Sequence, residues 1–336
     1  MTTLNLDLGE NSYEITVGRG LLDNIGNYLN LNRRVVIVTD EGVPSQYAEK
    51  VLTASKSATV VTLPQGESTK SFKYFELLLT KMLEFGLTRT DAIVAVGGGV
   101  VGDLTGFAAA SYMRGIDFYN IPTTLLAAVD SSVGGKCAIN LGTTQNTVGA
   151  FYQPKGVVID LDSLKTLDER QISQGLAESV KMALTSDEAL FSFIESTELG
   201  DEALEKIVID SLKIKIGVTS RDEKETGLRK ILNFGHTLGH GIEAEMLSTL
   251  YHGECVALGM IPMASPELRP RITALLKKLG LQTKVDINIE NALSHIVNDK
   301  KADGDEISAV FVDKIGSFRI QKMKIEAFCD YIRKNV

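Results

Sequence analysis

The stretch Asp91-AIVAVGGGVVG-Asp103 decides the fold of the first half of this chain. Its apolar run, residues 92–96, is typical of a buried parallel strand. Gly97, Gly99 and Gly102 follow as G-x-G-x-x-G, a pattern in which backbone meets a pyrophosphate where a helix begins. Helical sequence then runs over 104–112. Glycine-rich turns also occur as plain packing, and this one comes later than the usual fingerprint. The stretch therefore predicts a strand–turn–helix unit and, as a hypothesis, a dinucleotide site.

Strand and helix patterns alternate on both sides of this stretch. β-Branched runs predict strands at 34–40, 58–63, 118–121 and 157–159, and those at 34–40 and 58–63 are expected to be buried. Alternation over 3–7 and 12–17 predicts a hairpin. Residues 71–85 carry apolar side chains at i, i+3, i+4, i+7 and i+8, which predicts an amphipathic helix with Ser71 as its N-cap. Strands alternating with helices indicate a doubly wound parallel sheet.

The second half of the chain carries mainly helical patterns. Long helical patterns run over 169–184, 187–197, 201–219, 225–247 and 271–279, and a late hairpin is expected from 307–311 and 317–320. We therefore predict an α/β protein. A Rossmann-like parallel-sheet domain over residues 1–165 is expected to precede a mostly α-helical domain over residues 166–336.

Composition limits the classes of function. The chain has 336 residues, is 44% hydrophobic and carries a net charge of −8, which argues against a general nucleic-acid or anionic-membrane surface. An anionic substrate would need a local basic pocket. Cys137, Cys255 and Cys329 are far apart and form no CxxC pair, which fits a reducing compartment. No signal-peptide pattern or membrane-length apolar stretch is found, so we expect a soluble cytoplasmic protein.

Three of the four histidines fall within residues 236–252. If 225–243 were one helix, Glu225, Arg229, Asn233, His236 and His240 would share a polar face. Two imidazoles, an amide and a guanidinium on one face, followed by His252, indicate a metal and anion site. The alternative is a solvated helix face with incidental histidines.

Other polar groups lie near turns in the first half. Asp40 ends a predicted strand and fits either a ribose contact or a turn, and residues 66–70 form a second polar turn. Residues 130–136 and Asn146 could bind a polyhydroxylated substrate. The cations available for an anion are Arg114, Lys136, Lys181, Lys215 and Arg229, although a lone lysine is usually solvated.

These motifs, taken together, resemble the 3-dehydroquinate synthase family. The matching segments cover nearly the whole chain in order: GGGVVGD (97–103), MRG (113–115), PTTLLA (122–127), DSSVGGK (130–136), GAFYQP (149–154), GLAE (175–178) with Lys181, DEKETGLRKILNFGHTLGH (222–240) and HGE (252–254). NFGHTxGH with DSSVGGK is highly specific for this group. The family belongs to the sugar-phosphate cyclases and is related in fold to iron- or zinc-dependent glycerol dehydrogenases.

The resemblance implies conversion of 3-deoxy-D-arabino-heptulosonate 7-phosphate (DAHP) to 3-dehydroquinate and phosphate in the shikimate pathway. NAD-dependent transient oxidation, phosphate elimination, re-reduction and aldol closure would make the net reaction that of a lyase. It also implies a homodimer with Zn²⁺ or Co²⁺.

The implied metal ligands are Glu178, His236 and His252. The implied NAD contacts are Asp40, Glu67, Lys70, Gly98, Gly99, Val100, Asp103, Thr123, Thr124, Asp130, Lys136, Gln145 and Thr166. The implied substrate and catalytic residues are His240, Lys136, Asn146, Arg114 from a partner subunit, Lys181, Lys215, Arg229, Asn233 and a lysine of the pair Lys300 and Lys301.

The chain departs from the family pattern in two places. Gln145 stands where Lys usually precedes the Asn of Gly-Lys-Asn, so one cation is missing. Residues 261–271 carry three prolines and look shortened, which we interpret as trimming away from the site. Another sugar-phosphate cyclase, such as a 2-deoxy-scyllo-inosose synthase, and a catalytically idle relative stay open. A polyol dehydrogenase is disfavoured, because such relatives typically have Asp at the position of Glu178 and lack the phosphate-binding lysines.

Overall fold

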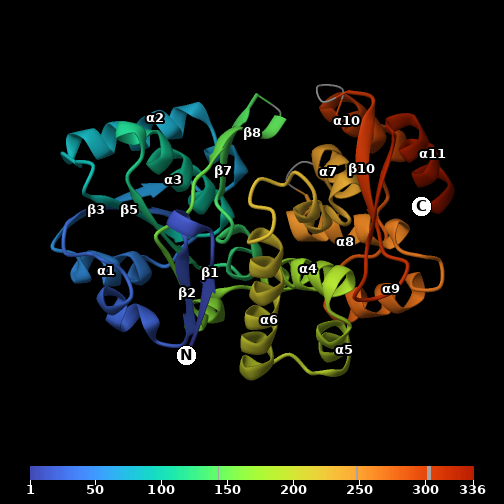
Figure 1. Cartoon of the computed structure of the whole chain (residues 1–336), viewed down its shortest axis with the longest axis horizontal. Coiled ribbons are helices and arrows are strands. Elements are labelled where there is room, and N and C mark those ends of the chain that lie inside the picture. Colours follow the sequence, from blue (N-terminus) through green and yellow to red (C-terminus); the bar gives the residue numbers. More distant parts are fainter. Residues whose placement is uncertain (143, 247–248, 301–303) are drawn as a thin grey trace. The chain divides into compact units, whose positions relative to one another are not determined.

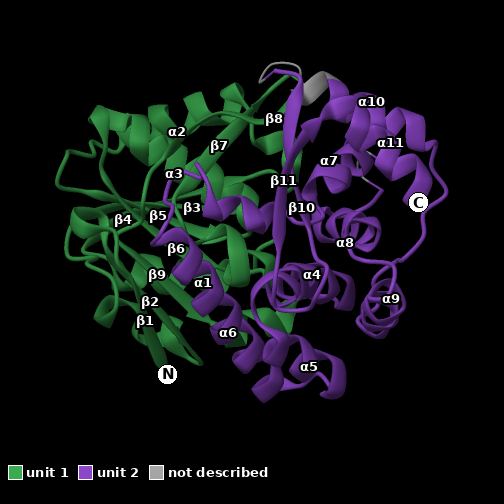
Figure 2. Cartoon of the chain, turned by 45° about the vertical axis from the view of Figure 1, so that its right-hand side comes forward, with its two compact units in different colours: residues 1–167 green, residues 168–336 purple. Residues whose placement is uncertain are grey.

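The first half of the chain is built on a twisted, mainly parallel sheet (Figure 1). The computed structural model describes residues 1–142, 144–246, 249–300 and 304–336. Within them the chain divides into two compact units, unit 1 (Met1–Leu167) and unit 2 (Asp168–Val336), coloured separately in Figure 2. None of the described helices is both long and apolar enough to cross a bilayer.

The sheet of unit 1 has the order β1-β2-β9-β6-β5-β3-β4, and only the β1–β2 pair is antiparallel. Its strands are β1 (Thr2–Leu6), β2 (Tyr13–Gly18), β3 (Arg34–Asp40), β4 (Ser57–Leu63), β5 (Ala92–Gly97), β6 (Asp117–Pro122) and β9 (Gly156–Asp160). A separate hairpin joins β7 (Lys136–Leu141) and β8 (Thr144–Phe151). The helices are α1 (Ser45–Ala54), α2 (Phe72–Glu84) and α3 (Gly99–Ser111), with short turns η1 (Gly9–Asn11), η2 (Leu21–Asn27), η3 (Glu67–Thr69), η4 (Tyr112–Arg114), η5 (Ala127–Ser131) and η6 (Leu161–Thr166).

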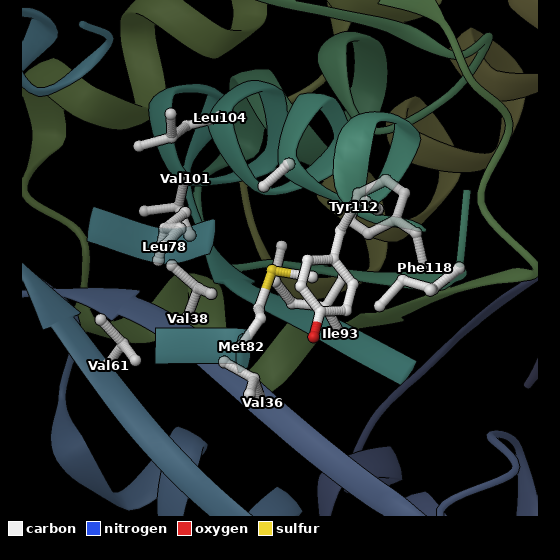
Figure 3. Close-up of a cluster of buried hydrophobic side chains, with 14 of the residues drawn as sticks. Val36, Val38, Val61, Leu78, Met82, Ile93, Val101, Leu104, Tyr112 and Phe118 are labelled. Carbon is white, nitrogen blue, oxygen red and sulfur yellow. The ribbon is translucent and has the colours of Figure 1, made fainter. Parts of the chain in front are cut away.

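Alternating side chains of the central strands bury both faces of the sheet. Val36 and Val38 of β3 pack with Ile93 of β5 beneath α2 and α3, in the cluster of Figure 3. Val35 and Ile37 point to the opposite face, where they pack against α1. The helices that follow β3 and β5 therefore lie on opposite faces. This confirms the prediction of a doubly wound sheet.

Three local predictions for unit 1 need correction. Helix α3 begins at Gly99 rather than at residue 104, because the glycine segment itself forms the first turn and Gly102 N donates to Gly98 O at 3.0 Å. Strand β4 is only partly buried, because it is the last strand of the sheet. Ser71 occupies the N-cap position of α2, but its side chain makes no capping hydrogen bond. The β7–β8 hairpin was not predicted.

Unit 2 is mostly helical, as expected. Its helices are α4 (Glu169–Ser186), α5 (Glu188–Ser196), α6 (Asp201–Thr219), α7 (His236–Glu245), α8 (His252–Met263), α9 (Arg269–Lys278), α10 (Ile289–Lys300) and α11 (Ile325–Asn335), with the 3-10 turn η7 (Leu228–Asn233). The late hairpin is confirmed as β10 (Glu306–Phe311) paired antiparallel with β11 (Arg319–Lys324). Helices α8, α10 and α11 were not predicted.

The single helix expected over 225–247 is wrong. The chain instead forms η7, breaks at Gly235 and starts α7 at His236. Gly235 has φ +79°, and a Cβ there would lie 2.6 Å from Met260 Cγ and 2.8 Å from Val256 O of α8. Only glycine fits this left-handed position against a neighbouring helix. The predicted polar stripe is therefore formed by a turn and a helix rather than by one continuous face.

Candidate functional site

A buried carboxylate meets two histidines in unit 2. Glu178 lies in α4 and is fully buried, while His236 and His252 are the first residues of α7 and α8. Their Nε2 atoms lie 3.7 Å and 3.6 Å from the same oxygen, Glu178 Oε1. His240, one turn further along α7, joins them, and the ligand atoms of the three histidines all lie within 4.8 Å of one another. The structure thus brings together the residues predicted for a metal site.

A network at the start of α8 fixes the backbone that presents His252. Glu254 accepts from Tyr251 N at 2.7 Å, and a reciprocal contact makes the pair a capping box. Arg170 of α4 donates to both Glu254 oxygens at 2.8 and 2.7 Å and lies over the Tyr251 ring. Pro262 lies near the opposite end of α8 from His252. The proline-rich segment is therefore remote from the histidine along this helix.

The electrostatics of the cluster fit a divalent cation. The Glu178 carboxylate forms an ion pair with Lys181 through Oε2, whereas Oε1 accepts no hydrogen bond from any described residue. A buried carboxylate oxygen without a donor is costly unless a cation binds it. One carboxylate and two imidazoles are a usual ligand set for catalytic zinc, which keeps further positions open. The donor set therefore fits the predicted metal.

Burial and charge set the protonation of the two histidines in opposite directions. Burial, together with the charge of Lys181, lowers the pKa of His236 well below its usual value. That imidazole is neutral at pH 7, the form that binds metals. Burial also acts to lower the pKa of His252, but the hydrogen bond and charge of Glu243 and the charge of Glu178 outweigh it, so this pKa is raised.

Three predicted cations are buried in the same unit. Lys181 is 1% exposed in α4, Lys215 5% in α6 and Arg229 2% in η7. These three elements pack on one apolar cluster formed by Met182, Val218, Ile231 and Leu232. Asn233 of η7 donates to Glu225, a residue with φ +60°. Buried lysine and arginine side chains on adjoining elements are what an anion such as phosphate would need.

The side chains of two predicted substrate lysines are not described by the structure. Lys300 ends α10, but its side chain is not among those described, and Lys301 lies outside the described residues.

In unit 1 the predicted cofactor residues gather at the carboxyl ends of adjacent parallel strands. Asp40 ends β3, Gly98 and Gly99 follow β5, and Thr123 follows β6, where its N–H donates to Gly97 O at 3.0 Å. Because α1 and α3 leave on opposite faces, a topological switch point falls between β3 and β5, where such sheets bind ligands. Burial raises the pKa of Asp40, and its Oδ1 accepts from Gly42 N at 2.8 Å.

The glycine turn can pack closely against its neighbours because it lacks side chains. A Cβ at Gly99 would lie 3.1 Å from Ser131 Oγ, and one at Gly98 would lie 3.1 Å from Thr124 Cγ2. Val100 follows in the first turn of α3, a helix of 13 residues whose N-terminal amides can face an anion. This cradle fits a dinucleotide pyrophosphate.

A polar network lies beside this turn. The buried Lys70 ammonium forms an ion pair with Asp103 at 2.7 Å and a hydrogen bond with Asn146, which has φ +55°. Glu67 accepts from Asn140 Nδ2 at 2.8 Å, and Asn140 Oδ1 accepts from Asn146 N at 2.8 Å. Gln145 precedes Asn146 in β8 and is half-buried. The predicted contacts Lys70, Asp103, Asn146 and Glu67 are therefore brought together.

The remaining predicted residues of unit 1 occupy separate turns. Thr124 caps the segment entering η5, where Ala127 N donates to its Oγ1 at 3.2 Å, and Asp130 lies in η5. Lys136, at the start of β7, and Thr166 are exposed, and Thr166 Oγ1 accepts from Tyr47 OH at 3.3 Å. Arg114 is exposed with φ +70° beside Met113 with φ +50°.

Sequence reasoning missed two supporting carboxylates. Glu243 of α7 lies 3.0 Å from His252 Nδ1, and its spacing of three residues from His240 was the available signal. Asp222 accepts from the backbone N–H groups of Thr226, Gly227 and Arg229 at 2.7–2.9 Å. It thereby fixes the loop that precedes Arg229.

Solved structures with this fold include two enzymes that bind NAD⁺ and a metal. A 2-deoxy-scyllo-inosose synthase complexed with carbaglucose-6-phosphate, NAD⁺ and Co²⁺ has a TM-score of 0.90 and 26% identity, with all of both chains covered. A 2-epi-5-epi-valiolone synthase from Streptomyces hygroscopicus with NAD⁺ and Zn²⁺ bound has a TM-score of 0.86 and 25% identity. In that case 98% of this chain and 99% of the other are covered.

Sequence relatives indicate which family of enzymes the chain belongs to. The family model described as 3-dehydroquinate synthase N-terminal matches residues 60–174, and the model described as 3-dehydroquinate synthase C-terminal matches residues 175–302. A 3-dehydroquinate synthase from Alkaliphilus metalliredigens is 42% identical over 328 residues, covering 92% of each chain. With the carboxylate, histidines and buried cations in place, these matches show that the chain belongs to the 3-dehydroquinate synthase family.

Proposed function

We propose that the protein is an NAD- and metal-dependent lyase that converts DAHP to 3-dehydroquinate and phosphate. The observation that carries the proposal is the buried Glu178 between His236 and His252, with the buried Lys181 against it. This arrangement occurs in a chain that is 42% identical to a 3-dehydroquinate synthase over 92% of its length. The resemblance to structures holding NAD⁺ with Co²⁺ or Zn²⁺ supports the same cofactors here.

Glu178, His236 and His252 would hold the divalent metal. When bound, NAD⁺ supplies reversible hydride transfer and the metal supplies Lewis-acid polarisation of a substrate oxygen. His240 is exposed within the histidine cluster, so its imidazole can accept or donate a proton at a substrate hydroxyl. The neutral state of His236 favours metal binding at neutral pH.

Lys181, Lys215 and Arg229 would hold the phosphate and stabilise it as it leaves. Their burial strengthens each charge-assisted hydrogen bond to a phosphate oxygen relative to an exposed lysine. Asn233, held by Glu225, can orient a substrate hydroxyl or carboxylate. Lys136 and Asn146 of the β7–β8 hairpin would add a cation and an amide toward the substrate. Elimination of a phosphate needs such a group of cations, and a simple polyol dehydrogenase does not.

The turn at Gly97–Gly99 and the switch point beside Asp40 would hold NAD. The amides of α3 would meet the pyrophosphate, and Asp40 can accept hydrogen bonds from a ribose. Lys70 and Asp103 border the same turn. Arg114 is exposed in a left-handed turn of unit 1, and the family resemblance implies that its guanidinium would contact a substrate bound by a second copy of the chain. A homodimer is part of the proposal for that reason.

The test measures the cofactor balance of the reaction. Catalytic amounts of NAD⁺ should support many turnovers of DAHP, with one phosphate released per substrate and no net rise in NADH absorbance. Stoichiometric NADH from a polyol, without phosphate release from DAHP, would instead identify a dehydrogenase. Glucose 6-phosphate and a seven-carbon sugar phosphate without a carboxylate, assayed in parallel, test for the other sugar-phosphate cyclases. Phosphate release from one of these but not from DAHP would overturn the proposed substrate.

A further inference from the structure

His236 and His252 present the same ring nitrogen to Glu178, but the other nitrogen of each ring contacts a different partner. Both present Nε2 to Glu178 Oε1, at 3.7 and 3.6 Å. At the other side of each ring, His236 Nδ1 lies 3.2 Å from the backbone oxygen of Phe234, and His252 Nδ1 lies 3.0 Å from Glu243 Oε2. One imidazole is backed by a neutral carbonyl and the other by a carboxylate.

These partners determine which ring nitrogen carries the proton. A carbonyl oxygen and a carboxylate oxygen can only accept, so Nδ1 is the N–H donor in both histidines. The Nε2 lone pair of each neutral ring is then directed toward Glu178. A carboxylate partner additionally draws positive charge onto the ring and makes Nε2 a stronger donor to a metal than a carbonyl partner does.

The fold places Glu243 where it can do this without being a ligand itself. Glu243 lies seven residues after His236 and three after His240 on α7, so all three share one helix face. Helix α7 packs against α8 (Figure 1), whose first residue is His252. The Glu243 side chain is 18% exposed and contacts the Nδ1 edge of His252, away from the Nε2 edge that faces Glu178.

We infer that Glu243 is a positioning residue for the metal site. It holds His252 in the Nδ1–H form with Nε2 toward Glu178, and its charge strengthens His252 as a metal donor. This inference rests on the proposed metal dependence and adds a residue to it. Removing the carboxylate should therefore weaken metal binding even though the three ligands remain.

The same helix offers a matched control. Glu245, two residues along α7, also contacts a histidine, with Oε2 3.5 Å from His295 Nε2. Its Oε1 accepts from Asn291 Nδ2 at 2.8 Å. Its side chain is 26% exposed, close to the value for Glu243. Glu245→Gln therefore removes an equivalent charge from the same helix at a carboxylate paired with a histidine outside the cluster.

The experiment measures metal binding directly rather than turnover. Full-length wild type, Glu243→Gln, Glu243→Ala and Glu245→Gln are stripped of metal and titrated with Zn²⁺ against a chromophoric chelator. We expect Zn²⁺ affinity to fall by about 10- to 100-fold in Glu243→Ala. The loss should be smaller in Glu243→Gln, whose amide oxygen still accepts from Nδ1, and absent in Glu245→Gln. Visible spectra of the Co²⁺ forms should change in the two Glu243 variants only, because their bands depend on ligand geometry.

Thermal unfolding of the metal-free proteins separates positioning from folding, since Glu243→Gln and Glu245→Gln should unfold at similar temperatures. Unchanged Zn²⁺ affinity and Co²⁺ spectra in both Glu243 variants would overturn the inference and leave the proposed function standing. An equal loss in Glu245→Gln would also overturn it, because the effect would then come from general charge. Failure of the wild type itself to bind Zn²⁺ or Co²⁺ would overturn the metal dependence first and the role of Glu243 with it.

Discussion

The Lys70 network of unit 1 and the Glu178 cluster of unit 2 are both groups of opposite charges, but they differ in how completely they are satisfied. Lys70 lies 2.7 Å from Asp103 of α3, the helix that the glycine turn begins, and is hydrogen-bonded to Asn146. Glu178 is fully buried and ion-paired with Lys181 through Oε2, but its Oε1 accepts no hydrogen bond from a described residue. The first region is a preformed cradle whose shape matters most. The second depends on the charge of one side chain and on a cation to complete it.

From this contrast, we expect the largest effect of any single substitution at Glu178. Glu178→Gln keeps the shape of the side chain but removes the charge that faces His236 and His252. We expect loss of Zn²⁺ affinity beyond the roughly 100-fold that loss of an outer partner costs, with turnover reduced to background. Metal content of the purified protein and phosphate release from DAHP measure this. Wild type stripped with a chelator and reloaded with Zn²⁺ is the control.

Folding must be checked in the same variant, because Lys181 is buried against Glu178. Removing one member of a buried pair can cost about 3–5 kcal/mol of folding free energy. Circular dichroism and thermal unfolding establish that the protein is folded. Full activity of metal-free wild type or of folded Glu178→Gln would contradict the prediction.

Much of unit 1 could be predicted because its local patterns agree with its packing. The apolar runs of β3 and β5 are buried on both faces of the sheet, which is the setting such runs indicate. The β7–β8 hairpin was missed because β8 carries polar residues and Gly149 without a regular apolar pattern. In β7, Cys137 and Ile139 alternate with Lys136 and Ala138 and are buried in the core cluster of unit 1, and this short pattern was the available signal.

The two histidines proposed as metal ligands could be predicted from the sequence because histidine is rare in this chain, whereas Glu178 was implied only by the family resemblance. The path of the chain around them could not be predicted. The spacing of His236, His240 and Arg229 fits a single helix, and only the contact between Gly235 and α8 breaks it. Glu243 and Asp222 were missed because a carboxylate's partner depends on tertiary structure. His252 and Arg229 lie nine and seven residues away in the chain.

Added side-chain volume in the glycine turn of unit 1 should weaken NAD⁺ binding. Gly99→Val places a branched side chain where a Cβ is already 3.1 Å from Ser131 Oγ, at the N-terminus of α3. We expect NAD⁺ affinity to fall by about tenfold or more, equivalent to at least about 1.4 kcal/mol. Zn²⁺ content should be unchanged, since the metal ligands belong to unit 2. Fluorescence titration with NADH measures the first and metal analysis the second.

Gly217→Ala provides the matched glycine control, because a Cβ at that helix position meets nothing within 4 Å. Unaltered NAD⁺ binding in Gly99→Val would show that the turn does not approach the cofactor. Loss of Zn²⁺ in that variant would show that the two sites are not independent.

Asp222 allows a smaller test of the loop that carries the buried Arg229. Burial opposes its ionisation, but three backbone N–H groups and the Thr226 hydroxyl outweigh this and lower the pKa of Asp222 to about 2. Because the unfolded value is about 3.9, its stabilisation is present above that pH and is lost as pH falls toward 2. Asp222→Ala should reduce the free energy of unfolding by about 1–2 kcal/mol at pH 6.

Urea unfolding at pH 6 and at pH 3 measures both effects. The difference between wild type and Asp222→Ala should shrink at the lower pH, where the carboxylate begins to protonate. Asp210→Ala is a suitable control, since Asp210 is paired with side chains of Lys206 and Lys213 rather than with backbone groups. A difference that stayed constant between the two pH values would mean that the charge of Asp222 does not stabilise the loop.

The smallest effect is expected at Gln145, where this chain lacks the lysine usual in the family. Gln145 is half-buried and directly precedes Asn146, which is hydrogen-bonded to Lys70. A charge-assisted hydrogen bond contributes about 1.5–3 kcal/mol at best, and a new ammonium near the existing one is partly opposed by repulsion. Gln145→Lys should therefore lower the NAD⁺ or DAHP concentration for half-maximal rate by only a few fold.

Gln145→Met, of similar length and without charge, should leave that concentration unchanged. Steady-state kinetics at varied salt measures the change, which should weaken as salt screens the charge. An unchanged or poorer apparent affinity in Gln145→Lys would mean that the Lys70 network already supplies the charge that the family takes from this position.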